Sequence, residues 1–358
     1  MQAGAPRILF LPRCGAHGIG EYVRCLTLAQ ALRERHPHAA IELAVPPSWL
    51  RLRGDDFPRA PLARDADAEG AFGAILARLR PHLVVTNNRG SARDLARARV
   101  HGAAVVAIAS TERRRRARRL GVLRSLDQLW IVPGEGRDAA RLPSRLVRWL
   151  AGSPRCEIVE TLHPPADPQR AAKRLVELGL DGVRYALFAP GGGGWQLDGR
   201  AAGDVFAAAA AKGARGGVRA VVVAGPLHRG AHAHDDGVIR LDEVEPEAMV
   251  DLASRAEVVV CAGGGFLGWA LSLGRPCVTT PMPVADQRQR TDACRAAGTA
   301  LVVDGTEAAL ADAALALLAD SGRRAALEAR LADVGPRNAL PRCVELLEEL
   351  LQRAGSSL

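Results

Sequence analysis

Short apolar runs alternate with longer amphipathic segments along the first half of the chain. The runs have the length of buried strands, and apolar residues in the segments between them recur three or four positions apart, as on one face of a helix. This rhythm predicts parallel strands that alternate with covering helices. The expected strands are Arg7–Pro12, Ala40–Pro46, His82–Thr86, Ala104–Ala109, Leu129–Pro133 and Cys156–Val159, and the expected helices are Gly20–His36, Glu69–Leu79, Ser91–Val100 and Arg137–Leu150.

The pattern is interrupted near the middle of the chain and then begins again. Leu162–Pro168 contains prolines, which end regular structure, so we place a linker between two domains there. The expected organisation is a first domain at 1–163, a second at 164–337 and a C-terminal helical segment at 338–358 that is able to pack back on the first. The expected strands of the second domain are Tyr185–Ala189, Ala220–Ala224, Val238–Leu241, Glu257–Cys261, Pro276–Thr280 and Ala300–Val303.

Length and composition agree with two α/β domains. A chain of 358 residues exceeds the usual size of one domain. Aromatic residues make up only 4% of it, which disfavours a β-sandwich. The net charge of +9 indicates an anionic partner, such as a phosphorylated substrate, an acidic membrane surface or a nucleic acid.

The cysteines give no sign of a disulfide framework or a zinc site, because they are scattered and include no Cys-x-x-Cys pair. No basic region followed by a long apolar region opens the chain, and no apolar stretch is long enough to span a membrane. We therefore expect a cytoplasmic protein without a cofactor. The cysteines are Cys14, Cys25, Cys156, Cys261, Cys277, Cys294 and Cys343.

Two glycine clusters in the second half suggest a phosphate site. Gly263, Gly264 and Gly265 follow one expected strand directly, and a run of four glycines at 191–194 follows another. Glycines at such turns expose backbone N–H groups at a helix N-terminus, where phosphate binds. A tight connection or a flexible linker would use the same residues. However, open α/β sheets bind ligands at the carboxyl ends of their strands, and Trp195-Gln196 and a helical pattern follow the second cluster, which favours a binding turn.

A third cluster joins the first expected strand to the first expected helix. Its glycines, Gly15, Gly18 and Gly20, do not form Gly-x-Gly-x-x-Gly. No acidic residue clearly closes a second strand either, so an NAD-dependent enzyme is disfavoured.

Two segments resemble a known superfamily. Gly18-Ile-Gly-Glu-Tyr-Val-Arg-Cys-Leu-Thr-Leu-Ala resembles the Gly-x-Gly-His-x-x-Arg-x-Leu-x-Leu-Ala element of PseG-type nucleotide-sugar hydrolases and, more loosely, the opening loop of MurG-type N-acetylglucosaminyltransferases. The segment from Val258-Val-Val-Cys-Ala-Gly-Gly-Gly to Gly274-Arg-Pro, with Pro281-Met-Pro and Asp286-Gln-Arg-Gln after it, resembles the donor-binding region of the same superfamily. The resemblance implies the GT-B architecture, in which two Rossmann-like domains face a central cleft.

This resemblance also implies positions for the site. In the superfamily, the second domain holds a nucleotide sugar by its diphosphate, base and sugar, and the first domain receives the acceptor. Carried over by position, the expected donor-side residues are Gly191, Gly192, Gly193, Gly194, Val244, Gly263, Gly264, Gly265, Trp269, Asp286, Arg288 and Gln289. The residues expected on the acceptor or phosphate side are Gly18, Gly20, Arg24, Ser110 and Thr111.

Two positions depart from the family pattern. Trp269 stands where the MurG pattern has a ribose-binding Glu, and Glu21 stands where the family has His. Inverting transfer needs a base for the acceptor hydroxyl and positive charge or helix dipoles for the departing diphosphate. Glu21 and His17 are the candidate bases, although Glu21 also fits a first-turn acid and His17 a solvated loop residue. Arg24, one turn after Glu21, either pairs with it or meets the substrate.

The resemblance predicts a glycosyltransferase that takes its sugar from a nucleoside diphosphate, most simply UDP, with inversion and without a metal ion. The acceptor is open, and an acidic or lipid-linked molecule is one option. A nucleotide-sugar hydrolase with the same donor site is the first alternative. A non-catalytic nucleotide- or sugar-binding protein is the second, since Glu21 and Trp269 are both departures.

Two charged segments allow further interpretations. His228, His232 and His234, followed by Asp235 and Asp236, contain metal-ligand residue types, but their spacing matches no zinc pattern and an exposed loop is expected.

The basic run Arg113–Arg119 is the largest concentration of charge. It is able to contact anionic lipid headgroups, to receive an acidic acceptor or to form a solvated helix. Nucleic acid is disfavoured because no aromatic residues are interleaved with the arginines and no known nucleic-acid module surrounds them.

Overall fold

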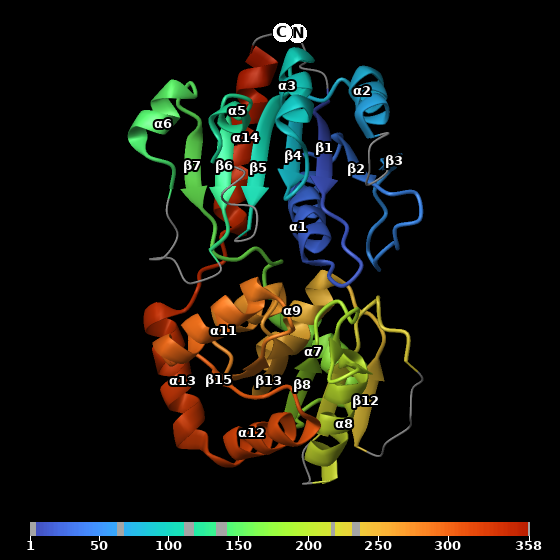
Figure 1. Ribbon diagram of the computed structural model, residues 1–358. Coiled ribbons are helices and arrows are strands. Elements are labelled where there is room, and N and C mark those ends of the chain that lie inside the picture. Colours follow the sequence, from blue (N-terminus) through green and yellow to red (C-terminus); the bar gives the residue numbers. More distant parts are fainter. Residues whose placement is uncertain are drawn as a thin grey trace.

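The chain folds into two α/β units that face each other across a cavity (Figure 1). The computed structural model describes residues 5–62, 68–110, 118–133, 142–215, 219–230 and 237–356. One sheet has seven strands in the order β3-β2-β1-β4-β5-β6-β7, and the other has six in the order β12-β11-β8-β13-β14-β15. Neighbouring strands are parallel in both sheets. The predicted α/β class is therefore confirmed.

The first sheet is covered on both faces, which explains why its strands are continuous apolar runs. Ile8 and Phe10 of β1 pack beneath α1 and α14, whereas Leu9 and Leu11 pack beneath α2 and α3. The strands are β1 Arg7–Pro12, β2 Ala40–Val45, β3 Arg59–Pro61, β4 Leu83–Asn87, β5 Ala104–Ala109, β6 Gln128–Ile131 and β7 Arg155–Ile158. The helices are α1 Gly20–Arg35, α2 Ala68–Leu79, α3 Ala92–Val100, α5 Leu120–Leu123, α6 Arg145–Leu150 and α14 Leu340–Ser356.

The second sheet is likewise buried between helices. Phe188 of β8 packs with residues of α8 and α12 on one face, and Leu187 packs with residues of α9 and α10 on the other. The strands are β8 Tyr185–Ala189, β11 Arg219–Val223, β12 Val238–Leu241, β13 Val258–Ala262, β14 Cys277–Thr280 and β15 Leu301–Val302. The helices are α7 Pro168–Glu177, α8 Ala202–Arg215, α9 Pro246–Arg255, α10 Gly265–Ser272, α11 Ala285–Ala297, α12 Glu307–Ala319 and α13 Ser321–Val334.

Two local predictions were wrong. The helix expected at Arg137–Leu150 begins only at Arg145, where the Ser144 side chain caps it, and residues 137–141 lie outside the described part. A hairpin, β9 Gln196–Leu197 with β10 Arg200–Ala201, follows the four glycines where a helix was expected. Its turn, Asp198-Gly199, has positive φ at both residues, which is the signature of a tight hairpin.

The chain crosses between the two units twice, and the crossing segments are joined. Thr161 forms a bridge with Asn338, and the Asn338 side-chain amide donates to the His163 carbonyl at 2.9 Å. After the second crossing, α14 returns to the first unit, where Glu348 pairs with Arg35 at 2.7 Å. The domain boundaries near residues 163 and 337 stay a prediction, and the two crossing segments are paired with each other between the sheets.

His163 of the first crossing segment is buried and forms hydrogen bonds through both ring nitrogens. Its Nδ1 donates to the Pro164 carbonyl at 2.7 Å, so Nε2 accepts from the Ser272 hydroxyl at 2.5 Å. Burial lowers the pKa of His163, although the hydrogen bond to the Pro164 carbonyl acts to raise it. The folded protein therefore favours the neutral ring. Its contribution to the stability of the fold is complete above the pKa of the unfolded chain, near 6.5, and is lost as the pH falls through the lower pKa of the folded protein.

We expect wild type to lose stability relative to His163→Gln as the pH falls from 8 to 5, with a slope of at most about 1.4 kcal/mol per pH unit. Denaturant unfolding of both proteins at each pH measures the difference. Because burial also lowers the pKa of His82, only the difference between the two proteins reports on His163. A difference that does not vary with pH would contradict the prediction.

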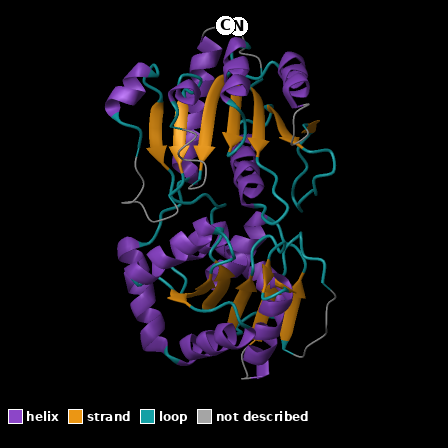
Figure 2. Cartoon of the chain, in the orientation of Figure 1, coloured by secondary structure: helices purple, strands orange, loops and turns teal. Residues whose placement is uncertain are grey.

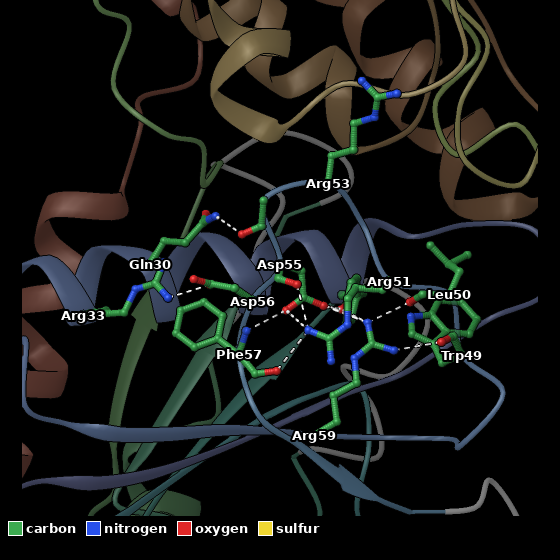
Figure 3. Close-up of polar contacts among 12 residues, drawn as sticks. Gln30, Arg33, Trp49, Leu50, Arg51, Arg53, Asp55, Asp56, Phe57 and Arg59 are labelled. Carbon is green, nitrogen blue, oxygen red and sulfur yellow. Dashed lines mark hydrogen bonds and ion pairs between the residues drawn. The ribbon is translucent and has the colours of Figure 1, made fainter.

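A buried polar cluster anchors the segment between β2 and β3 (Figure 3). Asp55 accepts hydrogen bonds from the Tyr22 hydroxyl and from Arg59, the latter at 2.7 Å. Burial and the Asp55 carboxylate raise the pKa of Tyr22. The cluster fixes Leu52 on the wall of the cavity and Arg53 against the second unit, where the Arg53 amide donates to Glu243 at 2.7 Å.

Candidate functional site

A cavity of about 1070 Å³ lies between the two units, at the carboxyl ends of their strands. Figure 2 shows the strands of the upper sheet pointing toward the second unit. The loops after β1, β5, β6 and β7 line the cavity from one side, and those after β8, β11, β12, β13 and β14 line it from the other. In open α/β sheets this edge is where ligands bind, because each loop there is free of the sheet and carries its own side chains.

Four helices begin at this cavity with uncapped N-termini. The residues preceding α1, α9, α10 and α11 form no side-chain cap hydrogen bond; they are Ile19, Glu245, Gly264 and Val284. By contrast, Ser91, Ser144, Asp167, Thr306 and Asp320 cap helices elsewhere. The first amides of a helix have no partner within it, and the helix dipole favours negative charge there. The start of α10, which has no acidic residue in its first turn, is therefore suited to an anion. The first turns of α1, α9 and α11 contain Glu21, Glu247 and Asp286.

Two arginines from opposite units add positive charge. Arg24 of α1 and Arg290 of α11 both line the cavity. Burial lowers the pKa of each, and the charge of Arg24 further lowers the pKa of Arg290. Guanidinium groups nevertheless stay protonated in proteins. Because the positive charges of Arg24 and Arg290 repel each other, an anion bound near both would relieve the repulsion.

Arg290 also holds the glycine loop after β13, because its guanidinium donates to the Gly263 carbonyl. Asp286, one turn earlier, lies 3.8 Å away. On the other wall, Arg24 donates to the side chain of Asn87 at 3.2 Å, and no hydrogen bond between Arg24 and Glu21 is present in the described part of the chain. Both guanidinium groups are thus positioned by their own unit.

Glu21 belongs to a small hydrogen-bonded array on the first unit. Its Oε1 accepts from the Asn88 side chain at 3.0 Å, and the same amide donates to Ser110 Oγ at 2.6 Å. The Ser110 backbone amide donates back to Asn88 at 3.0 Å. Among the described residues nothing hydrogen-bonds Glu21 Oε2, so this oxygen can accept a proton. Sequence analysis missed Asn88, although an Asn pair at a strand end is a known turn signal.

His17 connects the two units. Its Nδ1 lies 3.0 Å from the Gly194 carbonyl oxygen, and its ring packs on Trp195 with centroids 4.7 Å apart. A carbonyl only accepts, so Nδ1 carries the proton in the neutral ring and Nε2 is the basic nitrogen. The side chain of His17 is exposed. Its contacts join the loop after β1 in the first unit to the glycine loop at 191–194 in the second unit.

Most of the predicted site residues line the cavity. Residues 244, 246 and 249, at the start of α9 and just before it, also line it. The predicted residues on the cavity wall are His17, Gly18, Gly20, Glu21, Arg24, Ser110, Gly191, Gly192, Val244, Gly264, Gly265, Trp269, Asp286 and Gln289. Thr111 lies outside the described residues.

Three predicted glycines do not line the cavity and serve close packing instead. A Cβ at Gly193 would lie 2.6 Å from the Ala224 carbonyl oxygen, and one at Gly263 would lie 2.7 Å from Thr291 Cγ2. A Cβ at Gly194 would lie 2.8 Å from the Ala16 carbonyl oxygen in the other unit. These distances are shorter than any ordinary contact, so glycine is needed for the approach of the neighbours.

Arg288 was also wrongly assigned. It is exposed and lines a separate shallow pocket beside Pro281. Residues 286, 289, 290 and 293 of α11 face the main cavity, which is the spacing of one helix face, and position 288 falls outside it. Arg290 is therefore an arginine of α11 that lines the cavity, and its i,i+4 spacing from Asp286 is the signal that would have found it.

Trp269 gives the cavity an aromatic wall where the family pattern has an acid. Its ring lies 5.9 Å from the His163 ring and 6.2 Å from the Phe266 ring. The indole is almost completely buried among these neighbours. This part of the wall therefore offers an apolar surface rather than a carboxylate.

His228 is not the solvated loop residue that was expected. Its side chain is 5% exposed, and Nε2 lies 3.3 Å from Asp204 Oδ1. His232, His234, Asp235 and Asp236 lie outside the described residues, as does most of the basic run, at 113–117. Among the residues the structure describes, no group of three or more His, Cys, Asp or Glu is arranged to hold a metal ion, and no helix is long and apolar enough to cross a membrane.

No family model and no curated protein sequence matches this chain. Solved structures match nearly all of it. MurG of Acinetobacter baumannii has a TM-score of 0.60 at 14% identity, covering 96% of this chain and 99% of MurG. The spinosyn forosaminyltransferase SpnP has a TM-score of 0.59 at 16% identity, covering 98% and 100%. UGT2 of Phytolacca americana, complexed with UDP-2fluoro-glucose and pterostilbene, has a TM-score of 0.62 at 11% identity, covering 97% and 100%. The predicted GT-B fold is confirmed.

Proposed function

We propose that this chain, which has the GT-B fold, is a glycosyltransferase that takes its sugar from a nucleoside diphosphate. The observation that carries the proposal is the convergence of four uncapped helix N-termini and two partly buried arginines on one cavity. A diphosphate matches this arrangement in charge, and its departure with a negative charge is the step that such groups stabilise. The glycosyltransferase titles of the structural neighbours support the same reaction class.

Helix N-termini and Arg290 would then neutralise the leaving group, as a metal ion does in other enzymes. The Glu21 carboxylate is our candidate for the base that removes the proton from the acceptor hydroxyl. A base on the wall opposite the leaving group favours in-line displacement, and hence inversion at the sugar carbon. UDP is the first nucleotide to test because one structural neighbour is complexed with UDP-2fluoro-glucose.

Calorimetric titration tests the donor site directly. We expect UDP or another nucleoside diphosphate to bind the full chain, and EDTA to leave the affinity unchanged. Absence of binding by every nucleoside diphosphate at millimolar concentration would exclude the donor site. Loss of binding in EDTA would exclude only metal independence.

Transfer and hydrolysis differ in whether an acceptor or water meets the sugar in the cavity. The cavity, at about 1070 Å³, is at the upper end of the volumes of ligand pockets, about 300–1,000 Å³. Incubation of candidate nucleotide sugars without an acceptor distinguishes the two reactions. Slow release of free sugar supports a transferase, and rapid stoichiometric release supports a hydrolase.

Arg290→Ala is expected to weaken nucleoside diphosphate binding about 30-fold, because a charged hydrogen bond contributes roughly 1.5–3 kcal/mol. Arg288→Ala is the matched control, since it removes the same charge from the same helix outside the cavity. Calorimetry on both variants measures the difference. Equal weakening by the two variants would show that the charge acts only at long range.

Gly264→Val is expected to weaken binding at least about tenfold while the protein stays folded. A Cβ there would meet only Gln287 Nε2, at 3.8 Å, and the backbone φ of −80° suits any residue. The branched side chain would instead occupy space at the start of α10, where the phosphate is expected. Gly263→Val, whose Cβ would clash with Thr291, is expected to lower the melting temperature. Unchanged affinity in folded Gly264→Val would mean that this glycine serves only the turn.

A further inference from the structure

The segment between β2 and β3 reaches from the first unit to the second at one end of the cavity. Its Arg53 backbone amide donates to the Glu243 carboxylate at 2.7 Å. Gly54 lies against Glu245, since a Cβ at Gly54 would be 3.3 Å from Glu245 Cγ. Figure 3 shows the Arg53 side chain directed toward the second unit. We call residues 49–57 the β2–β3 arch.

Hydrogen bonds within the arch fix it to the first unit. The Asp55 amide donates to the Leu52 carbonyl at 3.1 Å and closes a turn. Arg51 donates to the carbonyl oxygens of Asp55 and Phe57 at 2.8 and 3.2 Å. The Asp55 side chain is fully buried. The conformation of the turn is therefore set before a ligand binds, which lowers the entropic cost of a contact with a ligand.

The arch brings an apolar side chain to the cavity. Leu52 lines the cavity although it is only 5% exposed. Leu52 directly precedes the residue whose amide bonds to the second unit, and Val244 directly follows the residue that accepts this bond. Both therefore lie at the same end of the cavity. The further cavity-lining residues at the start of α9 are Pro246 and Met249.

This end of the cavity is unsuited to phosphate. In the two segments that form it, 46–58 and 242–255, all residues are described, and those on the cavity wall include no arginine or lysine. Glu243 lies on this part of the wall, and Glu247 lies in the first turn of α9. A bound nucleoside diphosphate would therefore direct its phosphates to the start of α10 and its base to the apolar end. The arginines of the cavity wall are Arg13, Arg24, Arg290 and Arg330.

We infer that the β2–β3 arch closes the base end of the donor site. Leu52 packs on the face of the nucleobase, and the bond from Arg53 to Glu243 holds the arch in place. The inference rests on the proposed function, because it requires a nucleoside diphosphate in the cavity. The faces of a base are flat and weakly polar, so an aliphatic side chain packed on one face removes apolar surface from water. The first unit thus contributes to recognition of the nucleotide as well as to the acceptor side.

Calorimetric titration of the full chain with UDP tests the inference, with dTDP, ADP, GDP and CDP as further probes where UDP does not bind. Leu52→Ala is expected to weaken binding about tenfold, because the contact with the base is lost. Leu50→Ala is the matched control, since Leu50 packs against the same core of the first unit without lining the cavity. It should bind like wild type. Circular dichroism and thermal melting show whether each variant is folded.

Inorganic pyrophosphate separates the base from the phosphates. Measured by displacement of UDP, it should bind wild type and Leu52→Ala with the same affinity.

Two substitutions of Glu243 test the bond that holds the arch. Glu243→Ala and Glu243→Gln both remove the negative charge, but only Gln keeps an oxygen for the Arg53 amide. Glu243→Ala should therefore bind UDP at least about threefold more weakly than Glu243→Gln.

The outcomes distinguish this inference from the proposed function. If wild type binds no nucleoside diphosphate, the proposed function itself is wrong, and the inference is wrong with it. If wild type binds UDP and folded Leu52→Ala binds it equally well, the donor site stands but the arch does not contact the base. Equal weakening of UDP and pyrophosphate by Leu52→Ala would also overturn the inference. Should Leu52→Ala fail to fold, equal UDP binding by Glu243→Ala and Glu243→Gln would overturn it instead.

Discussion

Glu21→Gln is expected to lower kcat for sugar transfer by about 10²–10⁴-fold, because general base catalysis contributes a factor of this size. Gln keeps the shape of Glu and its hydrogen bond from Asn88, but it cannot accept a proton from the acceptor. The KM for the donor should change little, since Glu21 does not carry positive charge to the diphosphate. Steady-state kinetics with saturating donor and acceptor measure both constants.

His17→Gln is the companion variant because His17 is the other candidate base on the cavity wall. Its contacts with Gly194 and Trp195 give it a structural part in joining the units. We expect a change of about tenfold or less, mainly in the KM for the donor. The reverse result, with a large loss of kcat in His17→Gln and near wild-type activity in Glu21→Gln, would transfer the catalytic role to His17.

Asp55→Ala is expected to lower the free energy of unfolding by about 3–5 kcal/mol, since removal of one partner leaves the charge of Arg59 without compensation inside the protein. The Asp55 side chain is fully buried, and it accepts hydrogen bonds from Tyr22, Arg59 and the Phe57 amide (Figure 3). Denaturant unfolding followed by tryptophan fluorescence measures the change, because Trp49 lies beside Tyr22.

Asp56→Ala is the matched control in the next position. Asp56 pairs with Arg33 at 2.6 Å, but both side chains are largely exposed to solvent. Such pairs contribute about 0–1 kcal/mol, so this variant should unfold close to wild type. Similar losses in the two variants would mean that Asp55 is not the buried centre of the cluster.

The fold was predictable because the strands are buried on both faces. The run Val258–Ala262 is fully buried, and every position in it is apolar and visible in the sequence. Leu83–Val85 begins another buried strand in the same way. The short strand Arg59–Pro61 was missed because it has two polar or turn-forming residues among three. The hairpin after Leu197 was missed although Asp198-Gly199 carried its signal.

The site was less predictable, for a physical reason. The start of α11 was not fixed by a capping residue, because Val284 at that position has no side-chain oxygen. The resemblance of Asp286-Gln-Arg-Gln to the family pattern, carried over by position, named Arg288 and overlooked Arg290, which lines the cavity. Without a capping side chain, the first amides of α11 are free for an anion. For the same reason, the sequence has no local signal that marks the start of this helix. The contact between Tyr22 and Asp55, 33 positions apart, has no local signal at all.

The absence of a side chain on Gly194 governs how closely the two sheets can approach. A methyl group there would lie 2.8 Å from the Ala16 carbonyl oxygen and 2.9 Å from His17 Cα, well inside contact distance. Both backbones belong to loops outside the strands, and one of the loops would have to move. A single alanine would therefore loosen the contact between the two units at this point of the cavity, without touching Glu21 or Arg290.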